Sequence, residues 1–152
     1  GHGLQGWGPG HRGLVLMDTL TRINQMFGRR PSWDDYFLDI AKAVSKRGDC
    51  RRSPNGAVIV RNNRIVSTGY NGTPAGDPAS CLNGDCPRGL LSDEERASLT
   101  ADYTDCIALH AEQNAIAYAT VAGDTIYLSG SAPCDMCSIL IRAAGIQRVV
   151  TP

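Results

Sequence analysis

The sequence lacks a long hydrophobic run. None of its 152 residues falls in a stretch of about eighteen or more apolar side chains, so no membrane-spanning helix is predicted. It also lacks a charged segment followed by an apolar core and a small-residue cleavage site, the pattern of a secretory signal. These two absences predict a cytoplasmic protein without a membrane partner.

The sequence has no excess of charge of either sign. Fifteen basic and fifteen acidic side chains give a formal net charge of zero at pH 7. Domains that bind nucleic acid broadly are usually basic, so a nucleic-acid partner is not expected. A small substrate, including an anionic one, is compatible with this composition.

Histidine is scarce, and its three positions differ in context. His2 and His11 lie in a glycine-rich start without periodicity, and residues 14–27 are only weakly amphipathic. Residues 1–29 are therefore predicted to be a flexible leader or a peripheral helix, and residues 30–152 a single domain. The third histidine, His110, lies inside that domain.

His110 belongs to a pattern that predicts a catalytic zinc site. It starts an H-x-E motif, and a P-C-x-x-C motif supplies Cys134 and Cys137 after 23 intervening residues. One histidine and two cysteines can provide three ligands of a tetrahedral zinc and leave the fourth position open for water. Glu112, two residues from the histidine, is the candidate general acid and base for the protons of that water.

Four further cysteines are associated with a long loop: two lie in it, one directly follows it, and one comes just after the first predicted helix. Residues 73–105 are rich in proline, glycine, aspartate and serine, and loops of this length are usually functional or stapled. The thiols could form a second, closed zinc site that pins the loop, or they could be buried free cysteines. Without a secretory signal, disulfides are not expected. The four are Cys50, Cys81, Cys86 and Cys106.

Periodicity predicts an α/β domain. A capping-box variant at Ser32 and Asp35 starts a helix over residues 33–46, and a turn at Asn62-Asn63 joins two strands into a hairpin. The order αββαβαβ predicts a mixed sheet with helices on both faces. The remaining predicted elements are strands over 57–60, 65–68, 125–129 and 147–151, helices over 108–122 and 134–144, and a short helix after Ser92.

Several polar side chains allow two interpretations. The basic cluster Lys46, Arg47, Arg51 and Arg52 could meet a phosphate or could be a solvated helix end, and Arg88 is predicted to be solvated. Asn71, in a Gly-Tyr-Asn-Gly turn, is either a turn residue or a ligand contact, because α/β sheets bind ligands where strands end.

The shared order of six segments carries a family resemblance. The chain from about residue 30 to 151 resembles the deoxycytidylate (dCMP) deaminases of the zinc-dependent cytidine deaminase superfamily. Apart from the zinc motifs, each segment is weakly specific by itself. The segments are Pro31–Phe37, Gly56–Val60, Gly69–Gly72, His110–Ile116, Pro133–Cys137 and Ala144–Val150.

This resemblance implies a three-layer α/β/α fold and hydrolysis of a cytosine nucleotide, dCMP, to dUMP and ammonia. It implies that His110, Cys134 and Cys137 hold zinc and that Glu112 moves protons. It also implies a homo-oligomer regulated by nucleotide effectors. For the substrate, it implies that Asn71 binds the sugar and that the pyrimidine lies against Gly56, Ala57 and Ala111.

One departure from the family pattern concerns the base pocket. Asn55 stands where family members commonly carry valine, before the Gly-Ala of the first strand. A polar side chain there could select a modified or different base, which keeps open a deaminase of another nucleobase compound. The zinc motifs are also compatible with a tRNA or nucleic-acid deaminase, which zero net charge disfavours, and with a non-enzymatic zinc module, which Glu112 disfavours.

Overall fold

The computed structural model describes residues 28, 30–99, 103 and 105–152. The chain divides into two compact units, residues 1–31 and 32–152, and the second contains every helix and strand named below. The predicted peripheral helix within residues 1–29 lies outside the described residues. In the part of the chain that the structure describes, no helix combines the length and the apolar character needed to cross a membrane.

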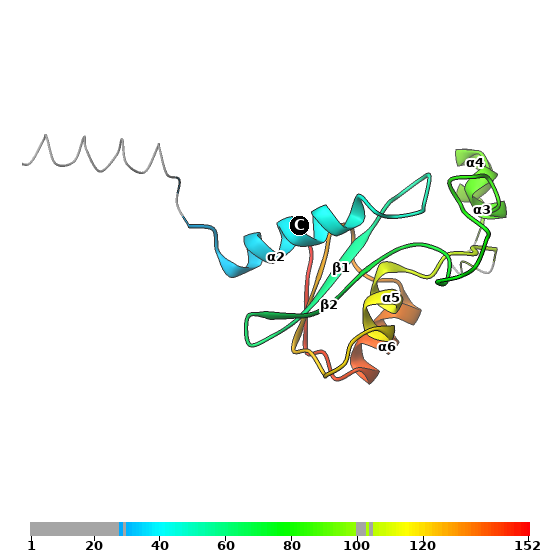
Figure 1. Cartoon of the computed structure of the whole chain (residues 1–152). Helices are drawn as coiled ribbons and strands as arrows, with labels where there is room; N and C mark the ends of the chain where they lie inside the picture. Colours follow the sequence, from blue (N-terminus) through cyan, green and yellow to red (C-terminus); the bar gives the residue numbers. More distant parts are fainter. Residues whose placement is uncertain (1–27, 29, 100–102, 104) are drawn as a thin grey trace, which may run out of the picture. The chain divides into compact units, whose positions relative to one another are not determined.

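A four-stranded sheet forms the centre of the second unit (Figure 1). Strand β1 pairs antiparallel with β2 and with β3, whereas β3 and β4 are parallel and are connected through helix α6 (Asp135–Ala143). The predicted mixed sheet is therefore confirmed. Across the sheet, the strands are β2 (Arg64–Tyr70), β1 (Gly56–Arg61), β3 (Thr125–Leu128) and β4 (Arg148–Val150).

Strands β1 and β2 form the predicted hairpin. Asn62 and Asn63 have φ values of 50° and 56°, which is the left-handed backbone that a two-residue turn between twisted strands requires. The first five residues of β1 are buried, as expected for a strand covered on both faces.

Helix α2 (Trp33–Ser45) covers one face of the sheet. Its N-terminus is capped as predicted, because the Asp35 amide donates to Ser32 Oγ at 3.1 Å. Phe37 and Ala41 are buried on its inner side. They pack against Val58, Val60 and Tyr127 of the sheet.

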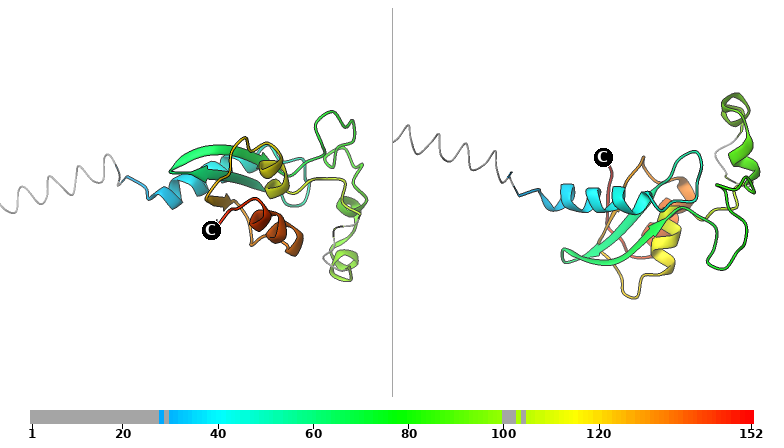
Figure 2. Two further views of the ribbon diagram at one scale, coloured as in Figure 1. Left: turned by 90° about the horizontal axis from the view of Figure 1, so that it is seen from below. Right: turned by 45° about the horizontal axis from the view of Figure 1, so that its top comes forward.

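Helices α5 (Ala111–Ala117) and α6 cover the opposite face, so the domain has the three α/β/α layers that the sequence predicts (Figure 2). Apart from the buried Ser67 hydroxyl, which donates to the Ala115 carbonyl at 2.7 Å, the core between these helices and the sheet is apolar. It comprises Ala57, Ile59, Ala111, Ala115, Ile126, Leu128, Ile141 and Ile146.

Helix α5 is shorter than predicted. The expected range, residues 108–122, was wrong at both ends. At the start, Leu109 exchanges backbone hydrogen bonds with Gly72 and is held in an extended conformation. At the end, Tyr118 leaves the helical conformation with φ −104° and ψ 4°. At the N-terminal end, tertiary pairing therefore overrides the helical pattern.

Two short helices lie in the cysteine-bearing loop, residues 73–105. Helix α4 (Asp93–Ala97) starts after Ser92 as predicted, with reciprocal capping between Ser92 and Glu95. Helix α3 (Pro87–Leu90) was not predicted. Its four residues are too few to produce a periodic pattern, although proline at the first position is typical of a helix start.

Two glycines set the spacing between the layers. A Cβ atom at Gly69 would overlap the backbone of Ala111 and Ala115 in α5, and one at Gly56 would overlap the backbone of Ala41 and Ser45 in α2. Because the overlapping atoms belong to the helix backbone, they could make room for a Cβ atom only if the whole helix were displaced.

Gly69→Ala is therefore expected to lower the free energy of unfolding by about 1–3 kcal/mol or more through overpacking. Urea denaturation would measure the loss. Thr68→Ala is the matched control, because Thr68 is the exposed neighbour on the same strand. Equal stability of the Gly69→Ala variant and the parent would contradict the close contact between β2 and α5.

Candidate metal centre

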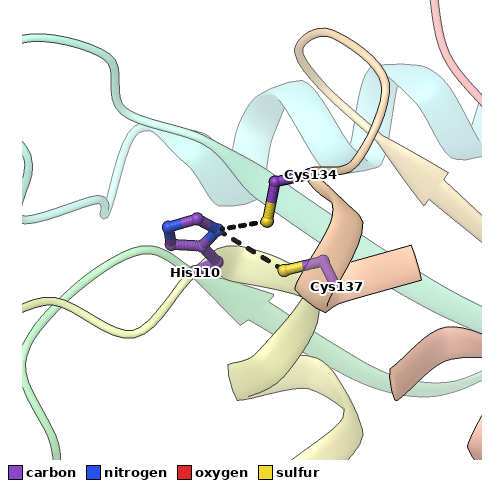
Figure 3. A group of neighbouring side chains, drawn as sticks. All are labelled: His110, Cys134 and Cys137. Atoms are coloured by element: carbon purple, nitrogen blue, oxygen red, sulfur yellow. Dashed lines mark hydrogen bonds between the residues drawn. The ribbon is translucent and has the colours of Figure 1, made fainter. Parts of the chain in front are cut away.

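The structure brings His110, Cys134 and Cys137 together (Figure 3). The His110 Nδ1 atom lies 3.6 Å from Cys134 Sγ and 3.4 Å from Cys137 Sγ, and the three ligand atoms are all within 4.8 Å of one another. A tetrahedral zinc with bonds of about 2.1 Å to nitrogen and about 2.3 Å to sulfur separates such atoms by about 3.6 Å. The donor set and its spacing fit a zinc ion.

Two helix N-termini position these donors. His110 is the N-cap of α5, and Cys134 is the N-cap of α6 with Cys137 in the first turn. The His110 backbone amide donates to Gln113 Oε1 at 2.7 Å, which fixes the backbone from which the imidazole projects. Sequence reasoning missed Gln113, although glutamine at the third helical position is a capping signal.

Glu112 lies in the first turn of α5, close to the Cys137 thiol. Burial raises the pKa of the Cys137 thiol above its ordinary value, and the nearby charge of Glu112 raises it further. The carboxylate therefore lies beside one of the candidate donors, and its role as acid and base stays a prediction.

A pocket of about 270 Å³ opens beside this cluster, with His110 and Cys134 in its lining. Four of the five predicted substrate contacts line it, together with the candidate acid and base Glu112; the four are Asn55, Gly56, Asn71 and Ala111. Ala57 does not line the pocket and is fully buried in the core.

Asn71 uses its amide to shape the pocket wall. Its Oδ1 atom accepts a hydrogen bond from the Asn55 amide at 2.7 Å, and its Nδ2 atom donates to the Ser53 carbonyl at 2.8 Å. The side chain thus holds the segment that leads into β1. Among the described residues, Nδ2 has no second acceptor, so its other hydrogen can donate to a ligand.

Asn55 is in contact with a glycine of the pocket lining, Gly130. A Cβ atom at Gly130 would overlap the Asn55 Oδ1 atom, so this glycine provides the room that the Asn55 side chain occupies. The amide lies on the wall next to Gly56. Its role in choosing a base stays a prediction.

The remaining four cysteines line the same pocket. Cys81 and Cys86 are buried, Cys50 and Cys106 are half-buried, and the Cys86 thiol contacts those of Cys81 and Cys106. Within the described residues, no three of these four reach the mutual distances found among His110, Cys134 and Cys137. The structure therefore does not decide between the two predictions for these cysteines, a second zinc site and buried free thiols.

The thiols of this cluster are unequal. Burial raises the pKa of Cys81 to about 11 and also raises the pKa of Cys106. Burial opposes ionisation of Cys86 too, but the backbone amides of Ile107 and Gly89 donate to its sulfur and bring its pKa below the ordinary value. The Cys50 sulfur accepts from the Ser53 amide at 3.4 Å. Amide donors of this kind stabilise thiolate, the form that binds metal.

Arg52 fastens the cysteine-bearing loop. Its guanidinium donates to the Gly89 carbonyl at 3.2 Å, to the Leu91 carbonyl, and to Asp93 Oδ1 at 2.8 Å. The sequence left open a phosphate contact or a solvated helix end for the basic cluster; the structure places the Arg52 guanidinium on the loop, and the phosphate contact stays a prediction. These partners are far from Arg52 along the chain, so no local pattern could have indicated them.

The chain is similar to a known protein family. Residues 31–152 match the family described as the cytidine and deoxycytidylate deaminase zinc-binding region. The deoxycytidylate deaminase of Mycobacterium phage D29 is 47% identical over 127 residues, which cover 81% of this chain and 96% of that protein. The deoxycytidylate deaminase of Schizosaccharomyces pombe is 40% identical over 124 residues, which cover 80% of this chain but only 37% of the yeast protein.

A solved structure supports the same relationship. The dCMP deaminase from the cyanophage S-TIM5 has been crystallised in apo form and in complex with dCMP and dUMP. Each structure has a TM-score of 0.59 with this chain and covers 81% of it. The identities are 28% and 29%, and the matches cover 84% and 82% of the cyanophage chains.

Proposed function

Since the chain belongs to the cytidine and deoxycytidylate deaminase family, we propose that it is a zinc-dependent hydrolase that converts dCMP to dUMP and ammonia. The observation that carries this proposal is the set of three donors at zinc spacing, with Glu112 beside them in a pocket. The names of the similar proteins supply the substrate.

In this proposal His110, Cys134 and Cys137 hold the zinc. The imidazole and two thiolates suit this metal, and three protein ligands leave a position for the reaction. Both cysteines lie at the start of α6, where the helix dipole favours negative sulfur. Bound zinc supplies Lewis acidity, which makes water a nucleophile at neutral pH.

Glu112 moves the protons of the reaction. As water adds to C4 of the cytosine ring, the carboxylate accepts one of its protons and passes it to ring N3. A second proton goes through the same carboxylate to the amino nitrogen, and the C4–N bond then breaks to release ammonia. The first turn of α5 fixes Glu112 two residues from His110, so one side chain can serve both transfers.

The remaining pocket residues hold the nucleotide. We assign a hydrogen bond to the sugar to the second hydrogen of the Asn71 side-chain amide. The face of the pyrimidine ring packs against Gly56 and Ala111, which line the pocket. Ala57 supports this wall from the core. The Asn55 amide favours a second candidate, a 5-substituted dCMP or another base, because it adds hydrogen-bonding capacity to the wall.

We also propose that Cys50, Cys81, Cys86 and Cys106 hold a second, structural zinc. Four cysteines form a closed site that needs no water ligand. The contacts among their thiols and the backbone amides that donate to Cys50 and Cys86 support this assignment. Such an ion would pin the loop that borders the pocket.

Glu112→Gln is expected to lower kcat for dCMP by about 100- to 10,000-fold, because the amide cannot carry the protons. Zinc content should stay at the parent value, since Glu112 is not assigned as a ligand. Ammonia release and metal analysis on the same sample measure both. Glu94→Gln, at an exposed position in the first turn of α4, is the control. Unchanged turnover of the Glu112→Gln variant would remove this residue from the mechanism.

Metal analysis tests the second zinc. The parent chain is expected to bind two zinc ions per chain, Cys86→Ser one, and His110→Ala one. The two variants should differ in activity, because only His110→Ala removes the metal next to Glu112. One zinc per chain in the parent would leave the four cysteines as free thiols.

We further propose a homo-oligomer that binds nucleotide effectors. Large apolar side chains are exposed on and beside α5 and α6, including Tyr118, Met136 and Ile139, and surfaces of this kind are often covered by another subunit. Light scattering should give a multiple of the 16.2 kDa chain mass. A monomer at the same concentration, with and without nucleotide, would contradict this.

A further inference from the structure

The end of the pocket formed by the cysteine-bearing loop is positively charged. Arg52, Arg88 and Arg96 line the pocket, and Glu112 is its only acidic lining residue within the described part of the chain. The carboxylate belongs to the metal end, whereas Arg88 and Arg96 come from the loop. This distribution favours a ligand with an anionic group away from its reactive atom.

The three arginines are not equally available. The Arg52 guanidinium is occupied by hydrogen bonds to the cysteine-bearing loop. Asp93 forms ion pairs with both Arg52 and Arg96. Arg88 forms no ion pair with any residue that the structure describes, although its side chain is half-buried. The Nε atom of Arg96 is buried and has no hydrogen-bond partner among the described residues. Buried donors without partners cost free energy, which a bound acceptor would recover.

Tyr103 connects Arg88 to the metal centre. The Arg88 guanidinium lies 4.7 Å from the centroid of the Tyr103 ring, and that ring meets the His110 imidazole edge-on at 4.6 Å. The guanidinium can be no further from the imidazole than these two distances combined. A nucleoside monophosphate can bridge such a span between its base and its phosphate.

We infer that Arg88, assisted by Arg96, binds the 5′-phosphate of the substrate and gives the enzyme its preference for a nucleotide over a nucleoside. This inference rests on the proposed deamination of dCMP. Arginine suits the role because its planar donors match phosphate oxygens and keep their charge at every relevant pH. The Tyr103 ring supports the guanidinium through a cation–π contact while its donor edges stay free.

The cysteine cluster positions this arginine. Arg88 lies in α3, whose N-cap is Cys86, and the next residue, Gly89, donates its amide to the Cys86 carbonyl at 3.0 Å. The Gly89 carbonyl in turn accepts from Arg52 at 3.2 Å. A Cβ atom at Gly89 would lie 3.1 Å from the Cys81 sulfur, so the turn is packed directly on the thiols. The loop thereby presents Arg88 from a fixed backbone.

The test compares dCMP with deoxycytidine. Arg88→Met is expected to lower kcat/KM for dCMP by about 10- to 100-fold, the effect of losing a charge-assisted hydrogen bond, and to leave kcat/KM for deoxycytidine within about twofold. Arg88→Lys should recover part of the dCMP activity, and Arg96→Met should lose less than Arg88→Met. Arg64→Met is the matched control, because Arg64 is an exposed arginine in β2 and does not line the pocket.

Binding provides a readout that does not require turnover. Calorimetry should show tighter binding of dUMP than of deoxyuridine to the parent, and Arg88→Met should weaken only the binding of dUMP. An equal loss for both ligands, or no loss, would overturn the assignment. Equal affinity of the parent for both ligands would overturn it too. If binding depends on Arg88 but dCMP is not deaminated, the phosphate site stands and the proposed reaction fails.

Discussion

The candidate metal centre depends on two helices, α5 and α6, whose N-termini lie next to each other on one face of the sheet. His110 is the last extended residue before α5, and Cys134 is the last before α6, so the metal donors sit where two sets of free backbone amides and two positive dipole ends converge. A shift of one residue in either helix start would rotate a donor by about 100° around the helix axis. The apolar core beneath α5 and α6 prevents that shift.

The parts of this protein that could be predicted from sequence depend on short-range patterns. The cluster of candidate zinc donors follows from two compact motifs, the hairpin from an Asn-Asn turn, and the start of α2 from one cap. The chemistry of the loop depends instead on contacts between residues far apart in sequence, such as Arg52 with Gly89 and Asp93, 37 and 41 residues away. No local pattern encodes these contacts.

Two errors illustrate the same limit. Arg88 was expected to be solvated because isolated arginines usually are, but the loop folds back and places its guanidinium over Tyr103. Residues 108–110 were expected to be helical because of their composition, but backbone pairing with Gly72 holds Leu109 extended. In both cases tertiary contacts, which composition does not report, decided the outcome. Exposure and helix ends are the properties most sensitive to such contacts.

The glycines between the layers also bear on how this scaffold can diversify. Gly56, which lines the pocket, brings β1 to backbone contact with α2, and Gly69 brings β2 to backbone contact with α5, the helix that begins after His110. The floor of the pocket at Gly56 can therefore accept no bulk without moving a whole helix. The rim of the pocket, formed by the arginines and thiols of the cysteine-bearing loop, is less constrained, because this loop is held in place by only a few contacts. Insertions and substitutions can accumulate there at little cost to the core. Evolution and laboratory selection for new substrates should therefore change the rim and leave the floor nearly invariant.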